Sequence, residues 1–361
     1  MAYTDIDNPE LYFQTKLYSG NGSTNAITLD GSENMQPNFV WIKNRPLSGG
    51  YAHNLFDSVR GTNKKIVSND DRAETTETNT LNSFNSNGFT LGNDSGTDEV
   101  NKSGTTFVSW NWKAGTSVSG TTTGAGTNKS YTGSVNTTSG ISIIRYQGNG
   151  TNGHTIPHHL GVTPTVMMVK RLTTSSNWSN YQSDFWVSGG NQYIDLNRSA
   201  AAAADSVMWY NTQPTSSVFT VGTNERTNYN NDYFINYLFT PIQGYSKFGS
   251  YVGNGNADGT FVYTGFKPAF VMVKRTDGAD QWSMSDNKRN GFNPQTPPLY
   301  ADSSEAENAS FYPFDFLSNG FKARSSSSSI NTSGGNYIYM AFAENPFVTS
   351  TDNGSIPACA R

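Results

Sequence analysis

Three short segments of the chain share one pattern of apolar residues, which begins with proline and ends with lysine. They are PNFVWIK from Pro37, PTVMMVK from Pro164 and PAFVMVK from Pro268. Because nearly every position between the two ends is apolar, each segment predicts a strand that is covered on both faces and lies centrally in a sheet. Proline is tolerated at the first residue of such a strand. The closing residues, Lys43, Lys170 and Lys274, are expected to reach solvent.

A second strand pattern follows each of these segments and alternates with a period of two. The segments are FVSWNW from Phe107, FINYLF from Phe234 and YIYMAF from Tyr337. One set of alternate positions is apolar in all three: Val108, Trp110, Trp112, Ile235, Tyr237, Phe239, Ile338, Met340 and Phe342. This alternation predicts a strand with one face on a hydrophobic core.

A Gly-Asn-Gly turn precedes each pair of strands. The turns are YSGNG closing at Gly22, YQGNG closing at Gly150 and YVGNG closing at Gly255. From the closing glycine to the proline the spacing is 15, 14 and 13 residues, and from the proline to the second strand it is 70, 70 and 69. Three landmarks held in register predict a unit that occurs three times. We interpret the glycines as structural, because they allow a turn with positive φ.

The spacing predicts an all-β protein built from three tandem β-sandwich units of the jelly-roll or concanavalin-like kind. Unit one covers residues 1–114, unit two 141–242 and unit three 243–348. Residues 115–140 are almost wholly Gly, Ser, Thr and Asn, which predicts a flexible or extended linker. Units two and three are joined with almost no spare chain, so they are expected to pack closely, with unit one more independent. Residues 349–361 form a C-terminal tail.

The composition of the chain argues against several classes of protein. Only 14% of the 361 residues are charged and the formal net charge is -4, which argues against a nucleic-acid-binding protein. The single cysteine, Cys359, excludes a disulfide framework within the chain. The first residues do not read as a signal peptide, and no apolar run approaches the length of a membrane span, so we expect a soluble protein made in a cytoplasm.

The histidines of HTIPHHLG, His154, His158 and His159, are the densest candidate for metal ligation. A structural role is favoured, because Pro157 interrupts regular helix geometry, no cysteine or acidic residue lies nearby in the sequence, and the other two units have no equivalent histidines. No metal site is therefore predicted.

Acidic pairs could mark a glycosidase, which needs two carboxylates across a cleft. The candidates are Glu74 with Glu77, Asp70 with Asp71, and Glu305 with Glu307. Solvated loop charges are the favoured interpretation, and NDSGTDEVN only loosely follows a calcium-loop spacing. The chain has no nucleophile elbow, phosphate-binding loop or zinc-protease motif, and Cys359 has no catalytic setting. We predict no enzyme activity, no catalytic residues and no cofactor.

Aromatic residues outside the two strand patterns could stack on sugar rings. The candidates are Trp178, Trp186 and Trp282, with core packing as the alternative for each. Unit one carries its tryptophan inside the lysine strand, as Trp41. A β-protein rich in aromatic residues and asparagine, without a catalytic motif, favours binding over catalysis.

Seven segments carry a resemblance to a known family over nearly the whole chain. They are PNFVWIKNR, NLFDSVRG, LNSFNSNGFTLG, FVSWNWKAG, IPHHLGVTPTVMMVKR, LSNGFKA and YIYMAFAENPF. The chain resembles a family of bacteriophage virion and tail-fibre proteins with repeated lectin-like β-domains, frequent in phages of marine cyanobacteria. The family brings no established catalytic residues. Many tail fibres begin with a docking region or a coiled shaft, whereas unit one is expected to begin within about a dozen residues of the first residue of this sequence.

The resemblance implies a tail fibre or tail-associated adhesin, exposed on the virion, that binds a glycan or protein of the host surface. The alternatives are a capsid decoration protein, a head fibre or a tail structural protein without a receptor, and, third, a glycan depolymerase. Other virion proteins are expected partners, and a homo-oligomer, such as a trimer, is expected because trimers are common among phage fibres. Neither nucleic-acid binding nor membrane insertion is expected.

Overall fold

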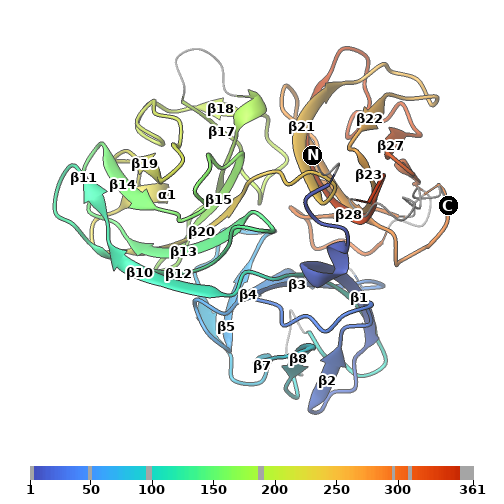
Figure 1. Cartoon of the computed structure of the whole chain (residues 1–361), viewed down its shortest axis with the longest axis horizontal. Helices are drawn as coiled ribbons and strands as arrows, with labels where there is room; N and C mark the ends of the chain where they lie inside the picture. The colour runs from blue at the N-terminus through green and yellow to red at the C-terminus, as the bar shows by residue number, and fades with distance from the viewer. Residues whose placement is uncertain are drawn as a thin grey trace.

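The protein is all-β. The computed structural model describes residues 4–47, 51–94, 100–185, 191–294, 297–307 and 311–349. Within them, helical structure is limited to three short pieces: η1 (Pro9–Leu11), η2 (Ser183–Phe185) and α1 (Glu225–Asn228). The strands form antiparallel sheets arranged in three lobes around a common centre (Figure 1). None of the helices in the described ranges is long and apolar enough to cross a membrane.

Unit one forms the blue lobe of Figure 1. Its strands are β1 (Phe13–Ser19), β2 (Asn25–Thr28), β3 (Phe39–Asn44), β4 (His53–Asp57), β5 (Lys64–Val67), β6 (Thr75–Thr76), β7 (Leu81–Asn85), β8 (Gly88–Leu91) and β9 (Thr106–Trp112). They make a large sheet in the order β1-β9-β3-β4-β5-β6 and a small sheet in the order β2-β8-β7.

Unit two forms the green lobe. Its strands are β10 (Thr116–Thr121), β11 (Thr123–Gly124), β12 (Ser130–Asn136), β13 (Ile141–Gln147), β14 (His154–Pro157), β15 (Val166–Arg171), β16 (Ser179–Gln182), β17 (Gln192–Tyr193), β18 (Ala203–Ala204), β19 (Val218–Val221) and β20 (Tyr233–Phe239). The large sheet has the order β10-β12-β13-β20-β15-β16, and the small sheet β11-β14-β19.

Unit three forms the orange lobe. Its strands are β21 (Ser246–Val252), β22 (Phe261–Tyr263), β23 (Phe266–Arg275), β24 (Ser283–Asp286), β25 (Leu299–Tyr300), β26 (Phe314–Leu317), β27 (Gly320–Ala323) and β28 (Asn336–Pro346). Its sheets have the orders β21-β28-β23-β24-β25 and β22-β27-β26. The lysine strands β3, β15 and β23 therefore occupy the same interior place in the three large sheets, as the sequence predicted.

The apolar face of the second strand pattern does lie on a core, but that core belongs to all three units. Trp110 and Trp112 of β9, Tyr237 and Phe239 of β20, and Phe342 of β28 belong to one buried cluster. The opposite faces of the same strands pack against each unit's own small sheet, in three separate clusters. Unit one is thus no more independent than the others, and the expectation that it would be is wrong.

Three equivalent backbone hydrogen bonds close the ring of units. The Glu74 amide donates to Leu172 at junction one–two, the Ala202 amide to Thr276 at junction two–three, and the Glu307 amide to Arg45 at junction three–one. Each acceptor lies two residues after the lysine of its unit. The contacts therefore follow an approximate threefold rule within one chain.

The three lysines obey the same rule. Lys43, Lys170 and Lys274 are fully buried, so the expectation that they reach solvent is wrong. Each Nζ donates to a backbone carbonyl of a neighbouring unit: Lys43 to Ser304 at 3.4 Å, Lys170 to Asp71 at 2.9 Å, and Lys274 to Ser199 at 3.0 Å. Burial lowers the pKa of Lys170 and of Lys274 to about 8. Carbonyl ligands are what a buried ammonium needs in place of water.

The segment 115–140 is not a flexible linker. Strand β12 pairs with β13 and extends the large sheet of unit two, β10 pairs with β12, and β11 pairs with β14 of the small sheet. The side chains of β10 are mostly exposed. The polar composition of the segment correctly predicted that these side chains are exposed. The backbone amide and carbonyl groups of the segment are nevertheless paired in the sheets.

Each Gly-Asn-Gly turn is held by an asparagine from far along the chain. Asn101, Asn228 and Asn331 are fully buried. Asn228 Oδ1 accepts from the Asn149 amide at 2.8 Å, and its Nδ2 donates to the Gly222 carbonyl at 2.7 Å. The closing glycines have φ of 67°, 70° and 69°. The structural interpretation of the turn is confirmed, because the left-handed backbone is one that glycine adopts without strain.

We expect the substitution Asn228→Ala to lower the free energy of unfolding by about 1–3 kcal/mol, because it leaves buried amide and carbonyl groups without partners. Asn228→Asp keeps the acceptor and removes the donor, so it should also destabilise. Urea denaturation of both variants beside Asn230→Ala, an exposed neighbour, measures the effect. Equal stability of Asn228→Ala and Asn230→Ala would contradict it.

Candidate functional site

The histidines of the HTIPHHLG segment do not form a metal centre among the described residues. His154 and His158 are fully buried and bonded to their own unit, His154 Nδ1 with Asn149 Nδ2 at 2.8 Å and His158 Nε2 with the Thr215 carbonyl at 3.1 Å. His159 lies at the surface and contacts the Tyr131 hydroxyl at 2.8 Å. The three rings therefore have separate structural partners.

A fourth histidine, His53, marks a position at which unit one differs from the other two units. In the strand register it takes the position held by Trp178 and Trp282 in the other units. Those tryptophans donate across junctions, to the Val67 carbonyl at 2.8 Å and the Asp195 carbonyl at 2.9 Å. His53 Nδ1 accepts from Trp41 Nε1 at 2.9 Å. Both tryptophans are buried and cannot serve as sugar platforms, while Trp186 lies outside the described residues.

Acidification should weaken the fold through these histidines. Burial, then the charges of Lys43 and Arg289, lower the pKa of His53 well below its usual value, and burial lowers those of His154 and His158. Unfolded histidines bind protons near pH 6.5. The unfolded state therefore binds more protons than the folded state as the pH falls through that value, and stability is lost.

The free energy of unfolding should consequently fall between about pH 7.5 and about pH 6, and His53→Gln should flatten that slope. Chemical denaturation at both pH values measures it. Asp302, whose pKa burial raises to about 6, acts in the opposite direction at lower pH and sets the lower limit of the window. An unchanged slope in His53→Gln would remove His53 from the explanation.

The candidate carboxylates are engaged in ion pairs or lie in loops. Glu74 pairs with Arg60 at 3.2 Å and Glu77 with Lys65 at 2.7 Å, and Asp70 pairs with Arg72. Glu307 pairs with Arg45 of unit one at 2.7 Å. Such pairs stabilise junctions and loops, so none of these groups is offered as a catalytic pair. Cys359 and most of the loosely calcium-like NDSGTDEVN segment lie outside the described residues.

Two buried Asp–Arg pairs escaped the sequence analysis. Asp57 pairs with Arg60, and Asp286 with Arg289. A neighbouring unit donates to each carboxylate, through the Tyr237 hydroxyl to Asp57 at 2.6 Å and through Trp110 Nε1 to Asp286 at 3.2 Å. The repeated D-x-x-R spacing was the signal that could have revealed them.

Unit two has a glutamine where units one and three have this aspartate. Gln182 occupies the register position of Asp57 and Asp286, and Met340 that of Tyr237 and Trp110. Methionine has no proton to donate. Gln182 Nε2 instead donates to the Gly249 carbonyl of unit three at 2.9 Å.

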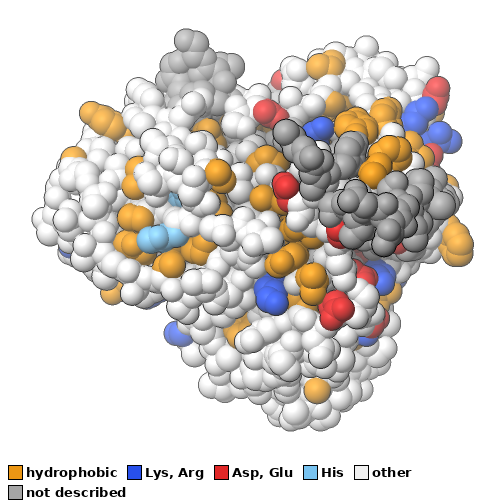
Figure 2. All heavy atoms as spheres, in the orientation of Figure 1, with side chains coloured by type: hydrophobic (Ala, Val, Ile, Leu, Met, Phe, Trp, Pro, Cys, Tyr) orange, Lys and Arg blue, Asp and Glu red, His pale blue; other side chains and the backbone are white. Residues whose placement is uncertain are grey.

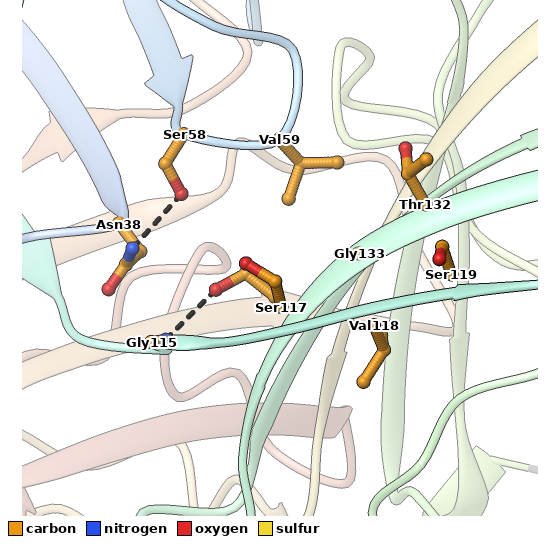
Figure 3. A pocket seen from close by; sticks show the side chains of 10 residues that line it. Asn38, Ser58, Val59, Gly115, Ser117, Val118, Ser119, Thr132 and Gly133 are labelled. Atoms are coloured by element: carbon orange, nitrogen blue, oxygen red, sulfur yellow. Dashed lines mark hydrogen bonds between the residues drawn. The ribbon is translucent and has the colours of Figure 1, made fainter.

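An open polar groove lies at junction one–two, with a volume of about 440 Å³. Figure 3 shows unit one's Asn38 and Ser58 across from the β10 and β12 strands. The residues that line the groove are Asn38, Ser58, Val59, Gly115, Ser117, Val118, Ser119, Thr132, Gly133 and Ser134. Two hydrogen bonds stabilise the wall of the groove. Asn38 Nδ2 donates to Ser58 Oγ at 3.0 Å, and the Gly115 amide donates to Ser134 Oγ at 2.9 Å.

The groove is lined by uncharged residues. Its lining holds hydroxyls, one amide and two valines, and none of its lining residues is charged. The side chains of Ser117, Ser119 and Thr132 are exposed to solvent. Hydroxyl and amide groups beside small apolar patches suit an uncharged ligand that offers hydroxyl or amide groups of its own. We call this surface the hydroxyl groove.

The face of the molecule in Figure 2 is largely uncharged as well. Most of the face in Figure 2 is white, with charged side chains scattered. Exposed large hydrophobic side chains also occur, and they are Val162, Tyr210, Tyr229, Val252, Phe261, Tyr263, Phe292 and Tyr312. Single exposed apolar residues are normal, so they do not by themselves define an interface.

A family model matches residues 8–346 of the chain. The chain belongs to the family described as Domain of unknown function (DUF7483). The match spans all three units, so the ring of units lies within one DUF7483 domain. No curated protein and no solved structure matches the chain.

Proposed function

We propose that this DUF7483 protein is a non-catalytic part of a phage virion, a tail fibre or tail-associated adhesin that binds a glycan or protein of the host surface. The observation that carries the proposal is the hydroxyl groove, an open and uncharged surface at junction one–two, in a molecule where Glu74, Glu307 and His154 are bonded within the fold. The assignment to a virion is based on the resemblance of the sequence motifs to virion proteins.

The finer architecture belongs to the same proposal. We interpret the three units as copies of one jelly-roll or concanavalin-like sandwich, which have diverged in the hairpin β10–β12 and in the junction contacts. The adhesin is made in the host cytoplasm and then exposed on the particle, where it contacts other virion proteins. Assembly into a homo-oligomer, such as a trimer, would add avidity to weak single sites.

A second candidate is a capsid decoration, head-fibre or tail structural protein without a receptor. The observation that favours it is the approximate threefold arrangement of the junction contacts, because such a ring can match a threefold site on a lattice. The exposed Phe292, Phe261 and Tyr263 would then be covered by neighbouring subunits.

Binding of the purified, labelled protein to host cells tests the first candidate. Filling the hydroxyl groove with Ser119→Trp should reduce binding, while Thr24→Ala, an exposed change in a unit-one loop, should not. Equal binding of both variants would remove the hydroxyl groove from the proposal. Electron microscopy of the particle tests the alternative: density over the capsid lattice would exclude host recognition as the main role.

A further inference from the structure

A positively charged side chain lies beside the hydroxyl groove on the same face of the unit-two sheet. In the strand register, Ser119 of β10 is opposite Thr132 of β12, and Thr132 is opposite Arg145 of β13. Residues opposite one another in an antiparallel sheet share one face. Ser119 and Thr132 line the hydroxyl groove (Figure 3). Arg145 therefore continues the row of these two groove residues by one strand.

The row lies on the side of the sheet that unit one borders. Ile143, two residues before Arg145 in β13, belongs to the buried cluster that the three units share. Successive side chains of a strand alternate between the two faces of a sheet, so Ile143 and Arg145 point to the same side. Ser58 and Val59 of unit one line the same groove. A ligand in the groove would consequently have Arg145 beside it.

The Arg145 guanidinium is held by an aromatic ring, not by a carboxylate. It lies 3.9 Å from the centroid of the Tyr233 ring, and both residues are partly exposed. Within the described ranges, no residue forms an ion pair or a hydrogen bond with the Arg145 side chain. Stacking on a ring orients the guanidinium and leaves the N–H donors at its edge available for a ligand.

Two carboxylates that unit one brings to this junction already have cationic partners. Asp57 pairs with Arg60 in the core. Glu74 pairs with Arg60 at 3.2 Å and lies 3.7 Å from Lys64 Nζ. Neither carboxylate forms an ion pair with Arg145, so its charge is open to an anion that comes from outside the chain.

The charge is specific to unit two. In the strand register, Leu17 of unit one and Ser250 of unit three take the place of Arg145. Among the described strands, unit two is also the unit whose large sheet is extended by the β10–β12 hairpin, which forms one wall of the groove. The guanidinium and the hydroxyl groove therefore occur together in the same unit.

We propose that the hydroxyl groove and Arg145 together bind an acidic glycan, a step that rests on the adhesin function. The guanidinium pairs with the carboxylate or sulfate of one sugar residue, and the groove hydroxyls bind the hydroxyls of a neutral residue beside it. A planar guanidinium forms two parallel hydrogen bonds to a carboxylate, which adds strength and direction. The formal net charge of the chain is -4, so general attraction of a polyanion does not explain such binding.

Affinity electrophoresis of the full chain, in native gels that contain a polysaccharide, tests the site. The probes are hyaluronan with its carboxyl-reduced form, and dextran sulfate with dextran, two pairs in which one member has the acidic group. An acidic probe should retard the protein more than its neutral partner does, because the neutral form offers no anion to the guanidinium. Retardation by hyaluronan assigns the carboxylate as the bound group, and retardation by dextran sulfate alone assigns the sulfate.

Arg145→Leu copies the residue of unit one and should weaken binding of the acidic probe about tenfold or more. Arg198→Leu is the matched control, because it removes the same charge from a side chain that is 57% exposed and lies outside the groove. Arg145→Lys keeps the charge without the planar fork and should bind with an intermediate affinity. Thermal unfolding of each variant confirms that it is folded before binding is compared.

Equal weakening by Arg145→Leu and Arg198→Leu, or retardation by the neutral probes as strong as by the acidic ones, would overturn the inference. If the protein attaches to host cells but neither acidic probe retards it, the acidic-glycan assignment fails while the adhesin function stands. If it neither attaches to host cells nor is retarded by a probe, both fail.

Discussion

Replacing Asp57 with alanine lowers the free energy of unfolding by about 3–5 kcal/mol, because it leaves the Arg60 guanidinium buried without its counter-charge. The side chains of Asp57 and Arg60 are 0% and 1% exposed. Although burial acts to lower it, the carboxylate of Asp57 raises the pKa of Arg60 above its usual value. The guanidinium therefore stays charged in the core, where an unpaired charge is costly.

The same substitution also removes a link between units, because the Tyr237 hydroxyl of unit two donates to Asp57. Denaturant unfolding followed by tryptophan fluorescence measures the loss. Asp30→Ala is the matched control, because the Lys16–Asp30 pair is at the surface and such pairs contribute less than about 1 kcal/mol. Comparable losses in the two variants would contradict the assigned role of Asp57.

A double variant separates the charge from the packing. Asp57→Leu combined with Arg60→Met removes both charges while keeping apolar volume, and replacement of a buried pair in this way is often close to neutral. Its free energy of unfolding should therefore lie nearer to that of the unmodified protein than to that of Asp57→Ala. A double variant that is less stable than Asp57→Ala would assign the loss to packing.

Phe342→Ala should cost about 3–5 kcal/mol, the usual range for emptying a large aromatic site in a core. Its ring centroid lies 5.2 Å from that of Phe13 in unit one and 5.8 Å from that of Phe239 in unit two. The side chain is 1% exposed, so the cavity would open at the place where the three units meet.

The shared core also predicts how the loss appears. Unfolding should remain one transition in which near-ultraviolet circular dichroism and fluorescence change together, because no unit buries its apolar face without the others. Phe292→Ala, at a residue that is 73% exposed, is the control and should change stability little. Two separate transitions in Phe342→Ala, with unit one unaffected, would show that the units fold independently.

Several features could be predicted because they are local. The all-apolar runs of β3, β15 and β23 identified central strands, since only a strand covered on both faces tolerates such a run. The Gly-Asn-Gly turns were correctly interpreted as structural. The Asn clamps that hold them lie about 80 residues away, so no window of the sequence contains both partners.

The chemistry of single residues was harder to predict. The closing lysines were expected to contact solvent, because an ammonium group usually does. In the fold, carbonyls of the same unit and of the neighbouring unit together replace that water. His53 could not be matched to Trp178 and Trp282 by spacing, because unit one places the residue later in its hairpin. The register of β3 with β4 made the equivalence visible.

The sequence by itself determined the all-β class and the apolar face of each second strand, while three tandem copies of one sandwich unit stay a prediction. The tertiary structure decided what those faces contact. A period of two marks which side of a strand is apolar, but it carries no information on whether the covering layer comes from the same unit or the next one. Likewise, the polar residues 115–140 determined that their side chains meet water, and only the fold decided that their backbone pairs with β13 and β14. Side-chain exposure is local in the sequence, whereas backbone pairing and ring closure depend on residues far apart in the chain.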